Sequence, residues 1–329
     1  MTKKITVIGG SGFVGTNLCR QLALKQKDFE IIDIKMSRQF PEKCKIADVR
    51  NVEALREAIT GSVVVNLAAV HRDDVSDKSE YWRTNVGGAE NISKVCEEKG
   101  IDKIVFTSTV AVYGFAEPGT DETGKINPFN DYGRTKYEAE ERLRAWHAKG
   151  DRSLIIVRPT VIFGEGNRGN VYNLFNQIAS RKFLMVGGGE NKKSMAYIGN
   201  VVAFLNSCIE TEGKYGLYNY VDSPDLNMNE LISHIREKLL KKRGVGVRLP
   251  YWIGVIIGYV ADLAAKIIKK SLPISSIRVK KFVSSTEFKS GKSRLDDFKA
   301  PFSMIDGIDR TLQSEFITPE PNREIFFTE

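Results

Sequence analysis

The sequence predicts an α/β fold built on a doubly wound parallel sheet, with a smaller α/β lobe after it. Three observations predict this fold: short apolar runs alternate with helical stretches up to about Arg158, a glycine-rich turn follows the first run, and the pattern loosens afterwards. The chain has 329 residues and a hydrophobic content of 42%, which is enough for a sizeable core.

Five apolar runs of strand length predict buried parallel strands. They are KKITVIGG, FEIIDIK, SVVVNLAAV, IDKIVFTSTV and SLIIVRP. Apolar residues at helical spacing predict helices over 16–24, 52–59, 81–99 and 132–149, and a further helix around 201–210. Alternation of this kind is typical of a parallel sheet with helices on both faces.

We expect two interleaved lobes. The larger comprises residues 1–165, and residues 195–222 are expected to return to it. Residues 166–194 and 223–329 are expected to form the smaller, substrate-facing lobe, which has an apolar helix near 250–270 and ends in a tail, TPEPNREIFFTE.

Charge and cysteine usage restrict the partners. The chain carries 49 basic and 41 acidic residues, a formal charge of +8, which suits anionic partners without choosing among them. Four cysteines without CxxC spacing predict reduced thiols and no metal site. The N-terminus enters a strand at once, so we expect a cytoplasmic protein.

A glycine-rich turn, GGSGFVG, lies between the first strand and the first helix. Gly9, Gly12 and Gly15 permit a tight turn there, and together with Phe13 and Val14 they place backbone N–H groups where a pyrophosphate binds at a helix N-terminus. The spacing is GxxGxxG rather than GxGxxG, and a simple tight β-α turn is the alternative. Its position in the first βαβ unit favours nucleotide binding and a Rossmann-type fold.

Asp33 ends the second predicted strand, about twenty residues after the turn. A carboxylate there can hold the ribose hydroxyls and would repel a 2′-phosphate, so NAD is favoured over NADP. Lys35 and Arg38 follow; they either soften that preference or belong to a solvated loop.

Tyr132 and Lys136 in DYGRTK form an acid/base pair. Side chains four apart on a helix share one face, so the ammonium is expected to lower the pKa of the phenol and allow proton exchange near neutral pH. This pattern is typical of a dehydrogenase-type site.

Eight motifs give the chain a specific resemblance over nearly its whole length. They are GGSGFVG, ADVRN, NLAAVH, TNVGGAENI, TSTVAVYG, YGRTK, RPTVIFG and YIGNVVAF. The chain resembles the extended short-chain dehydrogenases/reductases of the sugar epimerase/dehydratase type. The resemblance implies NAD as cofactor and a homodimer formed through the helices 81–99 and 132–149, and no nucleic-acid partner is expected.

The resemblance also implies roles for further residues around the cofactor. Asp48 and Val49 would frame the adenine, His71 would lie near the nicotinamide ribose, and Asn85 would support the active-site backbone. Leu67, Ala68, Ala69 and Pro159 would line the cofactor. Alternatively, His71 is a loop histidine without chemistry and Asp48 caps the next helix.

In such enzymes a hydroxyl residue joins the tyrosine and lysine, and the motif FTSTVAVYG places Thr109 in that role, one position after Ser108. Thr109 would hydrogen-bond the reacting sugar hydroxyl, Tyr132 would remove its proton, and Lys136 would bind the nicotinamide ribose. The alternative is an ordinary strand threonine and a helix-start tyrosine.

Dehydratases of this type carry an Asp-Glu pair directly after the hydroxyl residue. Here Val110 and Ala111 follow Thr109, so the resemblance implies 4-epimerisation through a 4-keto sugar, and Val110 would border the substrate.

The residues expected to bind the substrate diphosphate differ from those of the family members that act on nucleotide sugars. Their diphosphate-binding arginine is replaced by Met195 in KKSMAYIGN, with Lys192 and Lys193 upstream. Arg278 in SSIRVKKF could supply the missing cation, as could Lys193; a solvated basic face is the alternative.

The segment LPYWIGVIIGYVADLAAKIIKKSLP is amphipathic. Its uncharged run, 249–261, covers 13 residues and is too short to span a bilayer. Trp252, Ile256 and Tyr259 lie on one helical stripe and Lys269 and Lys270 flank it, which suits a helix lying in an anionic lipid interface. A core or dimer helix is the alternative.

Four strings sharpen the resemblance: AAVHRDDVS, RPTVIFGEGNRGNVYNL, KSMAYIGN and YNYVDSPDLNMNEL. They are similar to the bacterial undecaprenyl-diphosphate-linked N-acetylglucosamine 4-epimerases, which implies a lipid-linked diphospho-sugar substrate for O-antigen or other surface glycans, used at the inner face of the cell membrane. Asn167, Arg168 and Asn170 would then hold the sugar or its diphosphate, or serve only as loop residues. Rival hypotheses are a soluble UDP-N-acetylhexosamine 4-epimerase, a 4-reductase and a noncatalytic NAD-binding scaffold.

Overall fold

A seven-stranded parallel sheet forms the centre of the computed structural model, which describes residues 3–72, 75–268, 275–291, 295 and 298–328. Its strand order is β10-β6-β5-β4-β1-β2-β3. The strands are β1 (Ile5–Ile8), β2 (Phe29–Asp33), β3 (Cys44–Ile46), β4 (Val63–Asn66), β5 (Lys103–Thr107), β6 (Ser153–Pro159) and β10 (Tyr215–Tyr220). All five predicted strands are present, and the predicted doubly wound sheet is confirmed. The order reverses between β1 and β4, the place where such sheets bind ligands.

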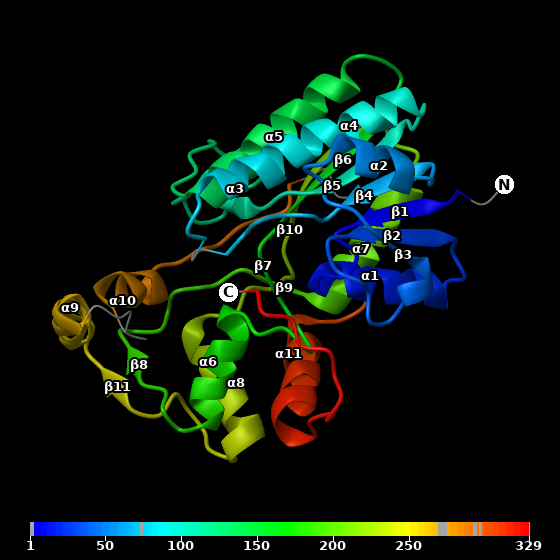
Figure 1. The fold of residues 1–329 in the computed structure, drawn as a ribbon. Coiled ribbons are helices and arrows are strands. Elements are labelled where there is room, and N and C mark those ends of the chain that lie inside the picture. Colours follow the sequence, from blue (N-terminus) through cyan, green and yellow to red (C-terminus); the bar gives the residue numbers. More distant parts are fainter. Residues whose placement is uncertain (1–2, 73–74, 269–274, 292–294, 296–297, 329) are drawn as a thin grey trace.

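Helices cover both faces of this sheet (Figure 1). One face packs against α1 (Phe13–Leu24) and α7 (Ile198–Glu210). The other packs against α2 (Val52–Ala58), α4 (Gly88–Glu98) and α5 (Asp131–His147). The helix predicted over 81–99 is present as one continuous helical run, made of α3 (Ser79–Tyr81), a π-helical turn η2 (Trp82–Gly87) and α4.

Alternate residues of the strands explain the two layers. Val63 and Val65 of β4 belong to the core beneath α1 and α7, whereas Val64 between them belongs to the core beneath α4 and α5. Side chains of a strand point to opposite faces in turn, so a continuous apolar run is what a sheet buried on both faces requires.

The remaining chain forms a second group of elements below the sheet in Figure 1. The helices are α6 (Asn170–Ala179), α8 (Met228–Leu240), α9 (Tyr251–Ile268), α10 (Ser276–Val283) and α11 (Met304–Leu312). Short strands β7 (Val161–Phe163) and β9 (Met195–Tyr197) pair with each other, as do β8 (Met185–Val186) and β11 (Arg248–Leu249). Short helical turns complete the chain at η1 (Pro41–Lys43), η3 (Val110–Tyr113) and η4 (Gln313–Ile317).

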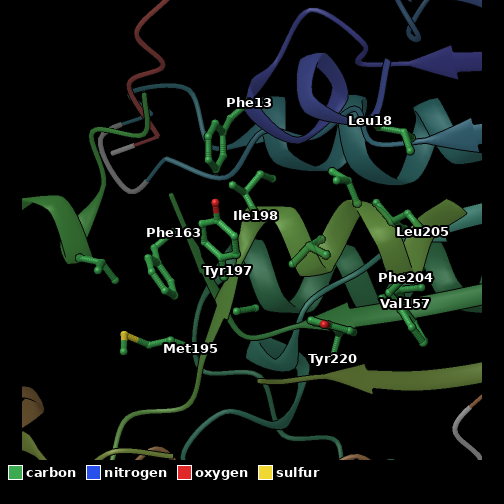
Figure 2. Packing of buried hydrophobic residues seen from close by; sticks show 14 of the residues in the cluster. Phe13, Leu18, Val157, Phe163, Met195, Tyr197, Ile198, Phe204, Leu205 and Tyr220 are labelled. Carbon is green, nitrogen blue, oxygen red and sulfur yellow. The ribbon is translucent and has the colours of Figure 1, made fainter. Parts of the chain in front are cut away.

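One apolar core joins the sheet to these elements. Figure 2 shows Phe13 at the start of α1 next to Tyr197 and Ile198, with Phe163 and Met195 farther along the same cluster. Met195, which replaces the expected arginine, is 4% exposed and belongs to this core. It therefore contributes packing rather than a surface for substrate.

Candidate active site

The glycine turn packs tightly against the end of β4. Gly9 has a φ of +79°, and a Cβ on it would lie 2.7 Å from the backbone nitrogen of Ala68. A Cβ on Gly15 would lie 2.3 Å from the carbonyl oxygen of Gly9. Gly12 precedes α1, whose first turn has no side-chain cap. The turn therefore leaves helix N–H groups available to an anion such as pyrophosphate, with Phe13 and Val14 in the first turn of α1.

Asp33 lies beside this turn at the end of β2. Its carboxylate accepts the backbone N–H of Ser11 at 2.9 Å and that of Lys35 at 3.1 Å. Burial raises its pKa, against the lowering effect of these hydrogen bonds. A carboxylate fixed in this way fits the ribose of NAD, so the residues present are compatible with the expected cofactor.

Asp48 and Val49 lie after β3, toward α2. Asp48 pairs with Arg50 at 2.6 Å, and hydrogen bonds from Arg50 lower the pKa of Asp48. Asn51 is the N-cap of α2, since its side chain accepts the N–H groups of Glu53 and Ala54. Asp48 therefore does not cap that helix. Val49 is buried.

Residues 67–71 leave β4 and run toward Tyr132. Asn85 fixes this segment, because its side chain accepts the N–H of Val70 at 2.9 Å and donates to the carbonyl of Val70 at 3.0 Å. The segment comprises Leu67, Ala68, Ala69, Val70 and His71. The His71 ring centroid lies 6.4 Å from that of Tyr132, and burial lowers the pKa of His71. Pro159 is buried at the end of β6.

Tyr132 and Thr109 meet where α5 begins. Asn130 caps this helix, its side chain accepting the N–H of Gly133 at 2.9 Å. The Thr109 side chain accepts the N–H of Ala111 at 3.1 Å and lies near the Tyr132 phenol, whose pKa it acts to lower against the larger effect of burial. The neighbouring Ser108 turns away and donates to Glu140 at 2.5 Å. Of the two hydroxyl residues, only Thr109 faces the tyrosine.

Lys136 is enclosed by apolar groups. It is 1% exposed, and its ammonium lies 4.1 Å from the centroid of the Phe106 ring. Burial lowers the pKa of Lys136 to about 7, although Glu140 acts in the opposite direction. Burial likewise raises the pKa of Tyr132 to about 12. The expected lowering of the tyrosine pKa by the lysine is therefore not found in the protein alone, because desolvation dominates and Lys136 is not among the groups that shift the Tyr132 pKa.

Glu140 lies one helical turn after Lys136 and organises a buried network that the sequence analysis missed. It accepts Arg158 Nε at 2.8 Å and Nη2 at 2.5 Å, and Arg144 Nη2 at 2.8 Å. Arg158 also donates to Tyr113 at 2.7 Å. The spacing of four from Lys136 on a helical face could have indicated Glu140. Since Ser108 donates to the same carboxylate, the network fixes the strand end that carries Thr109.

We expect Glu140→Gln to destabilise the protein by about 2 kcal/mol, because the buried Arg158 guanidinium loses its counter-charge. Denaturant unfolding measures this. Glu141→Gln is the matched control: Glu141 is 52% exposed in its ion pair with Arg144, and its loss should cost less than about 0.5 kcal/mol. Equal stability of the two variants would contradict the role of the network.

Lys136 also predicts how stability depends on pH. An ordinary lysine titrates near 10.5, whereas the folded pKa of Lys136 is about 7. Between these values the unfolded chain binds more protons, so Lys136 makes the free energy of unfolding rise with pH by about 1.4 kcal/mol per unit. We expect Lys136→Met to be more stable than the parent protein at pH 6, with an advantage that shrinks toward pH 10. Denaturant unfolding of both proteins across this range tests it, and a difference independent of pH would contradict it.

A cleft of about 480 Å³ opens beside Tyr132, between α3 and the segment leading into α5. Lys78 and Arg134 line it, and both lie near Asp131, at 3.6 Å and 2.7 Å. Val110 is half-buried in η3, directly after Thr109. The cleft is large enough for a sugar next to the phenol.

Three predicted substrate residues occupy the turn before α6. Asn167 is buried and donates to the carbonyl of Ile162 at 3.0 Å. Arg168 pairs with Glu315 at 2.7 Å and lies over the Tyr172 ring. Asn170 is exposed at the start of α6. Asn167 and Arg168 are therefore already engaged within the protein.

The two predicted cations of the second lobe lie around α10. Lys193 donates to the carbonyls of Lys281, at 2.8 Å, and Ser284, and burial lowers its pKa to about 8. It closes the end of α10 rather than projecting into the Tyr132 cleft. Arg278 is exposed in the first turn of that helix.

The chain matches the model of the NAD dependent epimerase/dehydratase family over residues 5–220. An N-acetyl-α-D-glucosaminyl-diphospho-ditrans,octacis-undecaprenol 4-epimerase from Escherichia coli O157:H7 is 46% identical, with both chains covered completely. A UDP-glucose 4-epimerase from Vibrio cholerae is 28% identical over 71% of this chain and 75% of the relative.

Solved structures of related enzymes share the fold. A UDP-glucuronic acid 4-epimerase from Bacillus cereus, solved with UDP-glucuronic acid and NAD, has a TM-score of 0.71 and 21% identity, with 94% of this chain and 97% of that chain covered. A UDP-glucose 4-epimerase from Thermotoga maritima, solved with UDP-glucose, has a TM-score of 0.73 and 18% identity over 94% and 97%. The chain belongs to the NAD dependent epimerase/dehydratase family, and NAD is its cofactor.

Proposed function

We propose that the protein is a 4-epimerase that interconverts undecaprenyl-diphospho-N-acetylglucosamine and its N-acetylgalactosamine epimer. The observation that carries this is the position of Tyr132 at an open cleft, with Thr109 acting on its phenol and Lys136 one turn farther along the same helix. Full-length similarity to a lipid-linked sugar 4-epimerase supports the choice of substrate.

The three residues have distinct proposed roles. Thr109 hydrogen-bonds the sugar O4 and orients it toward Tyr132, whose phenolate takes the O4 proton as the C4 hydrogen leaves with its electron pair. NAD, when bound, supplies the hydride acceptor and a positively charged nicotinamide ring. The 4-keto sugar then presents its opposite face, C4 regains hydride, and Tyr132 returns the proton to O4. Atoms and electrons balance over the cycle, and the product differs only at C4.

The proposed cycle requires Tyr132 to be ionised when it takes the O4 proton. With a lysine pKa of about 7 and a tyrosine pKa of about 12, both groups are largely neutral in the protein alone near pH 8. A cationic group near the phenol would lower the tyrosine pKa. We propose that Lys136 binds the ribose hydroxyls and that Gly9, Gly12 and Asp33 hold the remainder of the dinucleotide.

Helix α9 presents the surface that we propose to contact the membrane. Trp252, Ile256 and Tyr259 are 64%, 54% and 54% exposed. The opposite face carries glycines: a Cβ on Gly258 would lie 2.6 Å from the Ser276 backbone, so α10 packs closely there. The helix thus turns its small residues inward and its large apolar residues outward, unlike an ordinary core helix.

Basic residues border this apolar surface. Lys280 lies 3.3 Å from the Tyr259 hydroxyl, and Lys266 is exposed on α9. Lys269 and Lys270, also predicted to flank the helix, lie outside the described residues. No helix in the described part of the chain is long and apolar enough to cross a bilayer. We propose peripheral attachment to the inner face of the cell membrane, through apolar insertion and attraction to anionic lipid.

Separate incubations with undecaprenyl-diphospho-N-acetylglucosamine and UDP-N-acetylglucosamine test the proposed substrate. Epimerisation of the lipid-linked sugar supports the proposal. Conversion of the nucleotide sugar alone would indicate a soluble UDP-sugar 4-epimerase. Accumulation of a 4-keto sugar with release of one NADH per sugar would indicate a 4-reductase running in reverse. No conversion of either sugar would favour the noncatalytic scaffold.

We also propose a homodimer formed through α4 and α5. These helices lie side by side on one face of the sheet (Figure 1), and Arg142 of α5 pairs with Glu90 of α4 at 2.9 Å. Light scattering of the purified protein distinguishes dimer from monomer.

A further inference from the structure

We propose that residues 325–328, which we call the strap, form part of the NAD site and retain the nicotinamide half of the cofactor. This inference rests on the family's cofactor and not on the proposed lipid-linked substrate. The sequence TPEPNREIFFTE predicts only a tail for this segment. The structure instead places it between the sheet and the second group of elements, where the C-terminus is marked in Figure 1.

Backbone hydrogen bonds attach the strap to the turn before α6. The N–H of Phe326 donates to the carbonyl of Gly166 at 2.9 Å, and the N–H of Arg168 donates to the carbonyl of Phe326 at 2.8 Å. The Thr328 hydroxyl donates to Asn167 Oδ1 at 2.6 Å. The strap therefore pairs with this turn as a short parallel bridge.

Glycines in that turn make room for the strap. A Cβ on Gly166 would lie 2.8 Å from the Glu324 carbonyl oxygen, and one on Gly169 would lie 2.7 Å from the Thr328 hydroxyl. Glu315 of η4 stabilises the same turn. It accepts the N–H of Gly166 at 2.6 Å and pairs with Arg168. The close approach is thus built into the local backbone.

The two ends of the strap lie near two parts of the cofactor site: the start of α1 and the surroundings of Tyr132. The Phe326 ring lies 5.7 Å from the ring of Phe13, the first residue of α1 after the glycine turn. At the other end, the backbone of Thr328 lies near His71, where it acts to raise the His71 pKa against the larger effect of burial, and the His71 ring lies 6.4 Å from the Tyr132 ring.

This placement identifies what the strap covers. A pyrophosphate at the start of α1 lies next to Phe13, and hydride transfer requires the nicotinamide next to Tyr132. The nicotinamide half of NAD must therefore run from Phe13 toward Tyr132, which is the interval that Phe326 and Thr328 span. An enzyme that regains its hydride in each cycle needs no cofactor exchange, so a strap that slows NAD release is compatible with turnover.

Equilibrium binding of NAD to full-length variants, measured by calorimetry, tests the strap. We expect Phe326→Ala to raise the Kd for NAD about tenfold, because an aromatic contact at the cofactor's edge is lost. Phe327→Ala is the matched control: Phe327 is 72% exposed, and its variant should bind NAD within about twofold of the parent protein.

Thr328→Val provides a second test that preserves side-chain volume while removing the hydrogen bond to Asn167. We expect this variant to raise the Kd for NAD about fivefold, and it carries the test if Phe326→Ala does not fold. Unchanged affinity in the folded variants would overturn the proposal, and so would tighter binding, which would show that the strap competes with NAD. Either result would leave the epimerase assignment intact, since that depends on conversion of the sugar.

Discussion

Replacing Tyr132 with phenylalanine is expected to reduce kcat by about 10³-fold or more. The substitution removes the only atom that exchanges a proton with the sugar O4 in the proposed cycle, and acid/base catalysis of this kind contributes about 10² to 10⁴ in rate. The ring remains, so the packing of Tyr132 against His71 is preserved. Sugar interconversion and bound NAD should be measured on the same preparation: activity falls while cofactor content stays.

Tyr137→Phe is the matched control for this experiment. Tyr137 lies on the same helix, is half-buried, and packs against the cluster around Tyr113 and Phe288. Losing its hydroxyl should change kcat by less than about twofold. If Tyr132→Phe retained activity comparable to this control, the proton-transfer role would be wrong, and full biological complementation by Tyr132→Phe would support a scaffold.

Polar replacement of Trp252, Ile256 and Tyr259 by serine is expected to weaken binding to anionic vesicles about 100-fold. Each side chain is more than half exposed, and transfer of each into the lipid interface is worth about 1 kcal/mol. The sum, about 3 kcal/mol, corresponds to a factor of roughly 100. Co-sedimentation with phosphatidylglycerol vesicles measures the partition coefficient directly.

The control for this variant carries three exposed apolar side chains from other surfaces. Leu24, Ile46 and Ile305 are 84%, 56% and 36% exposed, and their joint replacement by serine should leave vesicle binding unchanged. If the α9 variant instead lost dimerisation while keeping vesicle binding, the surface would be an interface between copies of the chain.

The sheet was the part of the fold that the sequence predicted best. The five strands that it predicted lie in apolar runs, which is what burial on both faces demands. The structure adds β3 and β10, which the pattern did not reveal, because β3 has only three residues and β10 mixes Gly and Asn with tyrosines. The π-helical turn η2 within the 81–99 helix likewise leaves no trace in the apolar spacing.

Motifs in the sequence indicate residue types for the site, but burial decides the protonation of those residues, and no motif reveals it. The adjacent residues Ser108 and Thr109 act on different groups: Ser108 donates to Glu140, whereas Thr109 acts on the pKa of Tyr132. The pKa values of Tyr132 and Lys136 depend on desolvation by residues distant in the chain, such as Phe106.

The spacing of apolar residues could not predict contacts between residues far apart in the sequence. Phe326 and Phe13 are more than 300 residues apart, and no periodicity connects them. Glu140 is an intermediate case. Its spacing from Lys136 indicates a shared helical face, but helical spacing could not predict its ion pair with Arg158, because Arg158 lies on a strand.

The position of β10 has a consequence for synthesis of the chain. This strand, Tyr215–Tyr220, pairs with β6 at the edge of the sheet, yet 55 residues separate the two, and these include β7, α6, β9 and α7. Until residue 220 leaves the ribosome, β6 must remain an open edge with unpaired N–H and C=O groups, the kind of edge that promotes aggregation. We therefore expect nascent chains that end between β6 and β10 to bind chaperones, and longer ones to escape them.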